Sequence, residues 1–401
     1  MMKYLLCIIC LALPAYLIRF SIFGIPTTLL ELLIYAVFLI GLINWKNRQK
    51  ISAIHIWPAI LMLLAGLISV YIAPDKTVAL GQFKALFIDS IMVFWLVISY
   101  LKKEDFAWVF TGLVGSSLIV AGYSIFQKIV GQVTVDNRVI GIFGYTPNYP
   151  ALFLAPLAIM FMVHSVELII EKVSTTNKLL KIYTGFFVGI LGLFAIYFSG
   201  SRGAMLAVLG GFVFYLIVRF WPVIQARLWL KIIIGLIIII SMVSAWFVFK
   251  PNFLLNPAAG GRVTSSNNIR AEIWMTSFEL GKMHPVLGLG LGNYQAAFSE
   301  LTKNRVNFPE YISPFALSSH NIFLMFWLTT GLFGLISFVW LLVLFFQIGL
   351  RNINSPIRLV LMSAAVVIIL QGLVDTPYFK NDLSLLFWLI IGYMLLLEEQ
   401  E

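Results

Sequence analysis

Charged residues are scarce in this sequence. Only 11% of its 401 residues are Asp, Glu, Lys or Arg, whereas a soluble domain carries about 25%. Hydrophobic residues make up 61% of the chain, and its mean hydropathy is +0.98. A soluble globular protein is therefore excluded, and the composition indicates an integral membrane protein.

Cysteines and metal-binding patterns are equally sparse. Cys7 and Cys10 are the only cysteines, and two thiols on one apolar helix are typical packing residues. The sequence has no Asp-x-Asp pair, and its outer segments, as assigned below, have no cluster of His, Asp and Glu at metal-ligand spacing. We therefore expect a reaction that uses no metal and no cofactor.

Long apolar runs recur along nearly the whole chain. About twelve of them reach the roughly 17–25 residues that a helix needs to cross the hydrocarbon core. They cover approximately residues 4–22, 27–44, 53–73, 84–101, 107–130, 149–170, 181–199, 203–220, 229–249, 320–345, 356–373 and 382–398. The period-two alternation of a membrane barrel is absent, so we predict an all-α, polytopic transmembrane bundle forming one domain, residues 1–401.

The first run, residues 4–22, resembles a secretory signal in length. No small-residue cleavage site follows it, and another apolar run begins at once. We therefore read it as a retained helix.

The formal net charge of +10 comes from basic residues spread over short loops. No basic stripe with interleaved aromatic residues appears, so nucleic acid is not an expected partner. With the N-terminus in the cytoplasm, the inner segments carry twice as many basic residues as the short outer segments. This positive-inside bias predicts the orientation of the bundle.

One hydrophilic segment is long, at residues 250–319, and the predicted orientation places it outside the cytoplasm. Its stretch NNIRAEIWMTSFELGKM predicts an amphipathic helix, capped by Asn267 or Asn268. The expected apolar contacts of this helix are Ile273, Trp274, Phe278 and Leu280. We expect a small embedded subdomain on the membrane surface.

The stretch HPVLGLGLGNY, residues 284–294, superficially resembles a phosphate-binding loop. No strand precedes it, so it is not a dinucleotide fingerprint. Close packing of its backbone against the membrane or a ligand explains the glycines more simply.

His320 and Asn321 stand where the long polar segment meets a strongly apolar run. Of the other histidines, His55 and His164 fall on the inner side, and His284 lies on the outer side but away from a helix mouth. An imidazole can take a proton from a hydroxyl, which makes His320 a candidate general base. The alternative is that His320 caps the helix, whereas Asn321 is expected to fix the start of that helix.

Two outer arginines are candidates for binding an anion. Arg202 lies in the tight SGSRGAM connection, and Arg270 opens the amphipathic helix, whose positive end adds to its charge. Guanidinium groups suit the oxygens of a phosphate or diphosphate. The plainer alternative is that Arg202 reaches up to lipid headgroups and that Arg270 is a solvated helix residue.

Three further outer residues are secondary candidates. Arg138 could contribute another cation, and Asn148 could orient a sugar, although capping a helix is the more usual role of such an asparagine. Asp375 could orient His320 or pair with an arginine. It could equally lie in a surface turn with Lys380 and Asp382, where the charges compensate one another.

The ordered motifs resemble those of the O-antigen ligase/polymerase family. They are S-R-G-A at 201–204, R-x-x-x-W at 270–274, P-x-x-G-x-G-x-G at 285–292, and H-N followed by G-x-x-G at 320–334. The resemblance covers about residues 138–398.

The resemblance implies a membrane glycosyltransferase of GT-C type in the bacterial inner membrane, with its site on the periplasmic face. The donor would be an undecaprenyl-diphosphate-linked glycan, and the acceptor a glycan, lipid A core or protein. Arg202 and Arg270 would hold the diphosphate and His320 would activate the acceptor. The motifs leave three branches open: O-antigen ligase, polymerase and protein O-oligosaccharyltransferase.

A polysaccharide or lipid transporter is the competing class, because roughly twelve spans is a common transporter size. Transporters usually keep ionisable groups near the membrane midplane, often in two related halves. Asp89 is the strongest such group here, and no duplicated pattern accompanies it. We therefore favour the enzyme.

Overall fold

The computed structural model describes residues 1–22, 24–49, 52–144, 146–171, 177–227, 266–303 and 316–400. Within these residues the chain is mostly helical, and its one sheet is a two-stranded hairpin. The predicted all-α class is confirmed for this part of the chain.

The described chain contains long and short helices in the following order. They are α1 (Met2–Leu11), α2 (Leu29–Ile43), α3 (Ala53–Ile72), α4 (Lys76–Phe83), α5 (Asp89–Tyr100), α6 (Phe106–Ile129), α7 (Asn148–Ile170), α8 (Lys178–Ser199), α9 (Arg202–Arg219), α10 (Trp221–Ala226), α12 (Ser266–Met283), α13 (Tyr294–Thr302), α14 (Ile322–Arg351), α15 (Pro356–Gly372) and α16 (Asn381–Glu399). A π-helical turn, Lys84–Ile88, joins α4 to α5.

Seven helical stretches among the described residues are long and apolar enough to cross a membrane. They are Lys76–Tyr100, Lys103–Ile129, Asn148–Ile170, Lys178–Ser199, Arg202–Arg219, Ile322–Arg351 and Asn381–Glu399. Shorter apolar helices are Met2–Leu11, Leu29–Ile43, Ile56–Ile72 and Pro356–Gly372. The expected span at 229–249 lies outside the described residues, and the count of roughly twelve spans stays a prediction.

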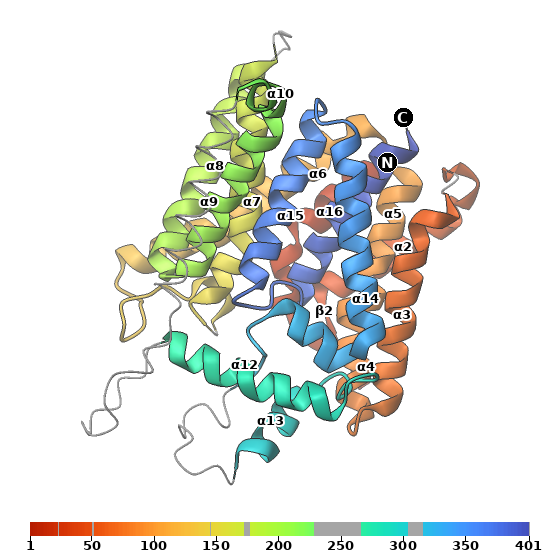
Figure 1. The fold of residues 1–401 in the computed structure, drawn as a ribbon. Helices are drawn as coiled ribbons and strands as arrows, with labels where there is room; N and C mark the ends of the chain where they lie inside the picture. Colours follow the sequence, from red (N-terminus) through yellow and green to blue (C-terminus); the bar gives the residue numbers. More distant parts are fainter. Residues whose placement is uncertain are drawn as a thin grey trace.

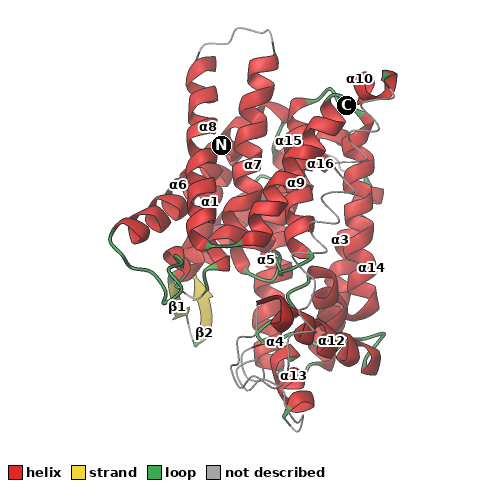
Figure 2. Cartoon of the chain, turned by 60° about the vertical axis from the view of Figure 1, so that its left-hand side comes forward, coloured by secondary structure: helices red, strands yellow, loops and turns green. Residues whose placement is uncertain are grey.

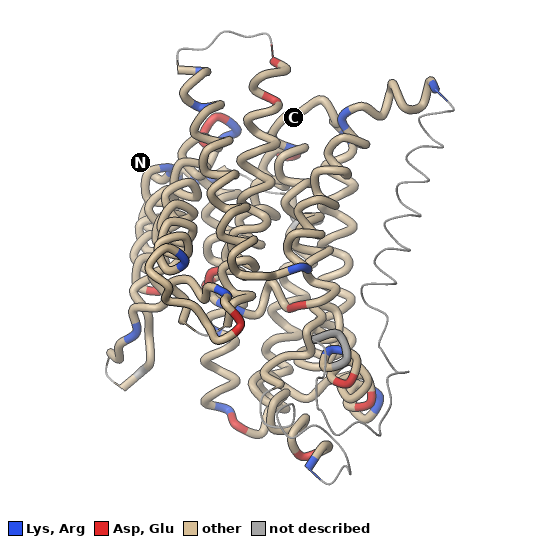
Figure 3. The backbone as a smooth tube through the Cα atoms, turned by 90° about the vertical axis from the view of Figure 1, so that its left-hand side faces the viewer, with Lys and Arg blue, Asp and Glu red and all other residues tan. Residues whose placement is uncertain are grey.

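The bundle has two distinct ends. Both termini lie at one end, and α12 and α13 lie across the other (Figure 1). Charged residues lie near the end that holds the termini and from about mid-height to the end that holds α12, and the band of tube between these two zones is almost free of charge (Figure 3). This distribution is that of a helical bundle whose middle contacts lipid.

The first apolar run does not form one long helix. α1 has only 10 residues, a length of about 15 Å, half the thickness of the hydrocarbon core. A 3-10 turn containing Pro14 follows, and strand β1 (Arg19–Ile22) then pairs antiparallel with β2 (Ile25–Thr28). Pro14 has no N–H for a continuing helix. The expectation of a spanning helix over 4–22 is therefore wrong, and the hairpin lies towards the end of the bundle that carries α12 (Figure 2).

The helix that follows His320 is broken at Gly331. This residue has φ +69° and ψ −168°, a conformation that is essentially restricted to glycine. The expected single span over 320–345 is therefore two helices. The second, residues 332–351, is long enough to cross the membrane.

The glycine-rich loop at 284–294 packs its main chain into this break. The amide of Leu289 donates to the carbonyl oxygen of Leu328 at 2.6 Å, and the amide of Leu332 donates to that of Val286 at 2.9 Å. A Cβ on Gly288 would lie 2.7 Å from the Leu328 oxygen. These glycines are closely packed as expected, but against the same chain and not against the membrane or a ligand: Gly288 packs on α14, and Gly290 and Gly292 pack on Ala73 and Val78.

We expect Gly331→Val to destabilise the protein by about 3 kcal/mol or more, because a side chain is strained at this φ by about 1–3 kcal/mol. Its Cβ would also lie 2.2 Å from the carbonyl oxygen of Val286. The measurement is thermal unfolding in detergent. Gly122→Val is the control, since a Cβ on Gly122 meets no atom within 4 Å. Equal losses of stability in the two variants would contradict the claim that the break at Gly331 requires glycine.

Candidate functional site

His320 precedes α14 in an unusual backbone conformation. Its φ is +46°, which costs a residue with a side chain about 1–3 kcal/mol. Asn321 caps the helix, because its Oδ1 accepts hydrogen bonds from the amides of Phe323 and Leu324, both at 3.0 Å. The alternative that His320 is the capping residue is therefore wrong.

Asp375 lies beside the His320 ring. Its Oδ1 is 3.5 Å from Nδ1 of His320 and accepts a hydrogen bond from the amide of Thr376 at 2.9 Å. Asp375 belongs to the connection between α15 and α16 and is only 9% exposed. The alternative of an exposed surface turn is therefore wrong, and the carboxylate is placed where it can orient an imidazole.

The charge state of Asp375 follows from its neighbours. Burial alone would raise the pKa of its carboxyl group, but the imidazole of His320 and the charge of Arg270 outweigh burial. The pKa of Asp375 is therefore held below its usual value. A negative charge faces Nδ1 of His320 at neutral pH.

Arg270 and Trp274 of α12 bind the main chain of the two segments that carry Asp375 and His320. Nε of Arg270 donates to the carbonyl oxygen of Val374 at 3.1 Å, and Nε1 of Trp274 donates to that of His320 at 3.1 Å. Residues four apart share one face of a helix. Burial lowers the pKa of Arg270, and Asp375 opposes that shift, so the guanidinium keeps its charge.

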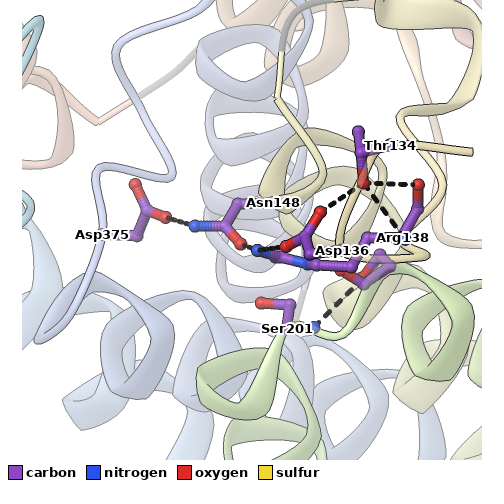
Figure 4. A network of polar contacts seen from close by, with 7 residues as sticks. Thr134, Asp136, Arg138, Asn148, Ser201 and Asp375 are labelled. Atoms are coloured by element: carbon purple, nitrogen blue, oxygen red, sulfur yellow. Dashed lines mark hydrogen bonds and ion pairs between the residues drawn. The ribbon is translucent and has the colours of Figure 1, made fainter. Parts of the chain in front are cut away.

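Arg138 and Asn148 extend the polar contacts away from Asp375 (Figure 4). Nη2 of Arg138 donates to Oδ1 of Asn148 at 2.8 Å, and Nδ2 of Asn148 donates to Oδ2 of Asp375 at 3.2 Å. Nε of Arg138 donates to the carbonyl oxygen of Ser199 at 2.6 Å. Asn148 is the first residue of α7, yet its side chain links Arg138 to Asp375 in place of the expected cap.

Arg202 is the exposed cation of this region. It is the first residue of α9 and makes no hydrogen bond or ion pair within the described part of the chain. The next residue, Gly203, packs against Val374, since a Cβ there would lie 2.8 Å from Cγ2 of Val374. No side chain caps α9. Its N-terminus therefore presents amide groups and Arg202 beside the connection that carries Asp375.

Lys380, expected only as a charge in a surface turn, is a further cation of this region. Its Nζ lies 4.2 Å from the centre of the Tyr149 ring, a cation–π contact. Burial lowers the pKa of Lys380. Asp382, expected to compensate Lys380 on the surface, is fully buried. Lys380 and Tyr149, which follows Asn148, are far apart in the sequence, and only the fold brings them together.

Tyr378 anchors the same connection to the N-terminal half of the chain. Its hydroxyl donates to the carbonyl oxygen of Leu86 at 2.8 Å and accepts from Nε1 of Trp388 at 3.1 Å. Leu86 lies in the π-helical turn between α4 and α5, and such turns leave a main-chain carbonyl without a helical partner. No signal in the sequence predicts this contact.

His164 and His284 lie apart from this cluster. His164 of α7 packs its ring against Phe110, with 4.5 Å between the ring centres, and His284 lies at a separate cavity. The side chain of His55 lies outside the described residues. Among the residues that the structure describes, no group of three or more His, Cys, Asp or Glu could hold a metal ion.

A comparison with known families covers part of this cluster, and Arg138, Asn148 and Asp375 lie outside the matched residues. Residues 187–339 match the model of the O-antigen ligase family, whereas no curated protein matches the chain. The matched segment contains Arg202, Arg270 and His320, and the family implies a membrane glycosyltransferase of the ligase or polymerase type. The resemblance seen in the motifs is therefore confirmed over residues 187–339, which are similar to the O-antigen ligase family.

Proposed function

We propose that this protein transfers an oligosaccharide or polysaccharide from a polyprenyl diphosphate carrier to an acceptor hydroxyl, on the periplasmic face of a bacterial inner membrane. One observation supports this most directly. His320 and Asp375 lie 3.5 Å apart, and Arg270 is bonded to Val374, the residue before Asp375. The residues proposed as base, orienting carboxylate and phosphate-binding group are thus neighbours, which supports the proposal.

His320 acts as the general base in this proposal. Asp375 faces Nδ1, so Nε2 is the ring atom that receives the proton of the acceptor hydroxyl. As the acceptor oxygen bonds to the anomeric carbon, the bond from that carbon to the diphosphate oxygen breaks. The charge of Asp375 stabilises the imidazolium that forms. Attack from the side opposite the diphosphate inverts the configuration of the sugar.

Arg202 and Arg270 stabilise the departing diphosphate. Diphosphate is a good leaving group, so it needs cations near its oxygens more than it needs a proton donor. The uncapped N-terminus of α9 adds to the positive charge at Arg202. Arg138 has a positioning role, because its guanidinium is bonded to Ser199 and Asn148.

We expect the purified protein to form glycan product from a polyprenyl-diphosphate-linked donor at an unchanged rate in excess EDTA, because arginines and a histidine supply the charge and the base. The measurement is product formation in detergent, followed on a gel. A requirement for a divalent cation would contradict the mechanism.

The pattern of product distinguishes the branches of the family. A ladder of repeats on the lipid carrier indicates a polymerase, and a shifted band of lipid A core or protein indicates a ligase or protein O-oligosaccharyltransferase.

A transporter is the second candidate function, supported by one buried carboxyl group. Asp89 in the Lys76–Tyr100 stretch is 2% exposed, and it lies near an ion pair between Glu31 and Lys84 at 2.9 Å. Detergent micelles have no sealed compartments, so donor-dependent product in them supports the enzyme. If the lipid moves across the membrane of sealed vesicles and no glycan product forms in micelles, the protein is a transporter.

A further inference from the structure

A cavity lies away from His320, where α12, the glycine-rich loop and α13 meet the connection between α3 and α4. Its volume is about 560 Å³, within the range of about 300–1,000 Å³ that is usual for ligand sites. Leu280 of α12 is among the lining residues. It is ten residues from Arg270, about 15 Å along the helix, so the cavity is separate from the site described above.

The lining is mainly aliphatic. Leu280 and Met283 come from α12, Leu289 from the glycine-rich loop, Ala297 from α13 and Ile72 from the end of α3. Surfaces of this kind favour an apolar chain that would otherwise contact water.

The polar lining residues are few and partly engaged. Nδ2 of Asn293 donates to the carbonyl oxygen of Leu289 at 3.0 Å, and Glu300 pairs with Lys303. His284 is exposed. The interior of the cavity therefore suits a hydrocarbon chain better than a polar glycan.

The cavity lies at the level of a membrane–water interface. Tyr71, beside the lining residue Ile72, is 82% exposed, and Nζ of Lys76 lies 5.7 Å from the centre of its ring. Exposed Tyr and Lys residues at helix ends mark the headgroup region of a bilayer. A lipid at this level would have its headgroup near Lys76.

Two walls of the cavity carry a lysine at the rim. Lys76 follows the lining residue Pro74 by two positions, and Lys282 directly precedes the lining residue Met283. Both lysines are exposed. Nζ of Lys76 donates to the carbonyl oxygen of Ala73 at 2.7 Å, and Nζ of Lys282 lies 4.8 Å from the centre of the Phe278 ring. Each cation thus belongs to a wall of the cavity, and cations beside an apolar cavity suit the phosphate group of a lipid.

We propose that this cavity binds an anionic glycerophospholipid, with one acyl chain inside the cavity and the phosphate between Lys76 and Lys282. This assignment does not depend on the transfer reaction. It assigns the α12–α13 region a second role, as the part of the protein that contacts the headgroup layer.

The test uses phosphatidylglycerol that carries a diazirine in one acyl chain. The purified full-length chain is irradiated with this probe in detergent and the labelled peptides are mapped. We expect label between residues 280 and 301. Ala297→Trp should reduce it at least about fivefold, because the added ring fills the volume of the chain. Ala296→Trp is the matched control, since Ala296 is the exposed neighbour of Ala297 and does not line the cavity.

The rim is tested with Lys76→Gln and Lys282→Gln. Each should lower the preference for phosphatidylglycerol over phosphatidylcholine about fivefold, whereas Lys46→Gln, at an exposed lysine away from the cavity, should leave it unchanged. If Ala297→Trp does not fold, Leu301→Phe from the same helix replaces it.

Three results would overturn the proposal. The first is label that persists in the cavity-filling variants, and the second is a lipid preference unaffected by the two rim lysines. The third is stronger competition by undecaprenyl phosphate than by unlabelled phosphatidylglycerol, which would assign the cavity to an isoprenoid chain.

Discussion

Replacing His320 by alanine is expected to lower the rate of glycan transfer by about 10²–10⁴-fold, the usual contribution of a general base. Binding of the lipid-linked donor should stay close to that of the unchanged protein, because the arginines, and not the imidazole, contact the diphosphate in the proposed mechanism. The measurements are turnover with a saturating donor and donor binding in the same detergent. An active His320→Ala protein would exclude His320 as the base.

His320→Gly separates the chemistry of this residue from its backbone strain. Glycine adopts a φ of +46° without a penalty, so this variant should fold at least as stably as the natural sequence and still be inactive. Asp375→Asn removes the charge that faces Nδ1. It should lower turnover less than His320→Ala does, because the ring remains but is no longer held by a carboxylate. If His320→Gly were unstable as well as inactive, the loss in His320→Ala could not be assigned to the base.

Arg270→Ala is expected to lower turnover by about 10²–10³-fold, the range seen when one group that stabilises developing negative charge is removed. Arg270→Lys should be intermediate, since an ammonium group keeps the charge but not the paired N–H groups of guanidinium. The measurement is kcat/KM for the donor at several salt concentrations.

Arg202→Ala is the clearer test of the diphosphate site. Arg270→Ala also removes the hydrogen bond to Val374, so its thermal stability has to be measured alongside its activity. Arg202 is exposed and has no hydrogen bond or ion pair to lose within the described residues, so a loss of donor use in Arg202→Ala reports on the substrate. Lys303→Ala is the control for both arginines. Equal effects of all three substitutions would mean that the arginines have no specific role.

Local patterns in the sequence predicted those helices whose formation depends on the residues of the helix itself. The apolar runs predicted α7, α8, α9 and α16 where the structure has them. A run of about 20 apolar residues enters lipid as a helix, because a helix satisfies the hydrogen bonds of its own main-chain N–H and C=O groups. α12 contains the predicted amphipathic segment, and its Ile273 and Leu280 are buried as expected, although Phe278 is 48% exposed.

Predictions failed where distant residues decide the local structure. Gly331 breaks α14 because the main chain of the glycine-rich loop enters there, and the composition of 320–345 carries no sign of that contact. The first run, residues 4–22, has a local cause instead: Pro14 cannot continue the helix, and the last part of the run pairs with the adjacent strand β2.

The sequence by itself determined that this is a helical membrane protein, and its ordered motifs indicated the O-antigen ligase family. Composition and motif order are properties of the chain alone. The structure decided that Asp375 faces His320 and that Asn148 links Asp375 to Arg138. These contacts join residues up to 227 positions apart, and only the packing of the helices brings their ends together.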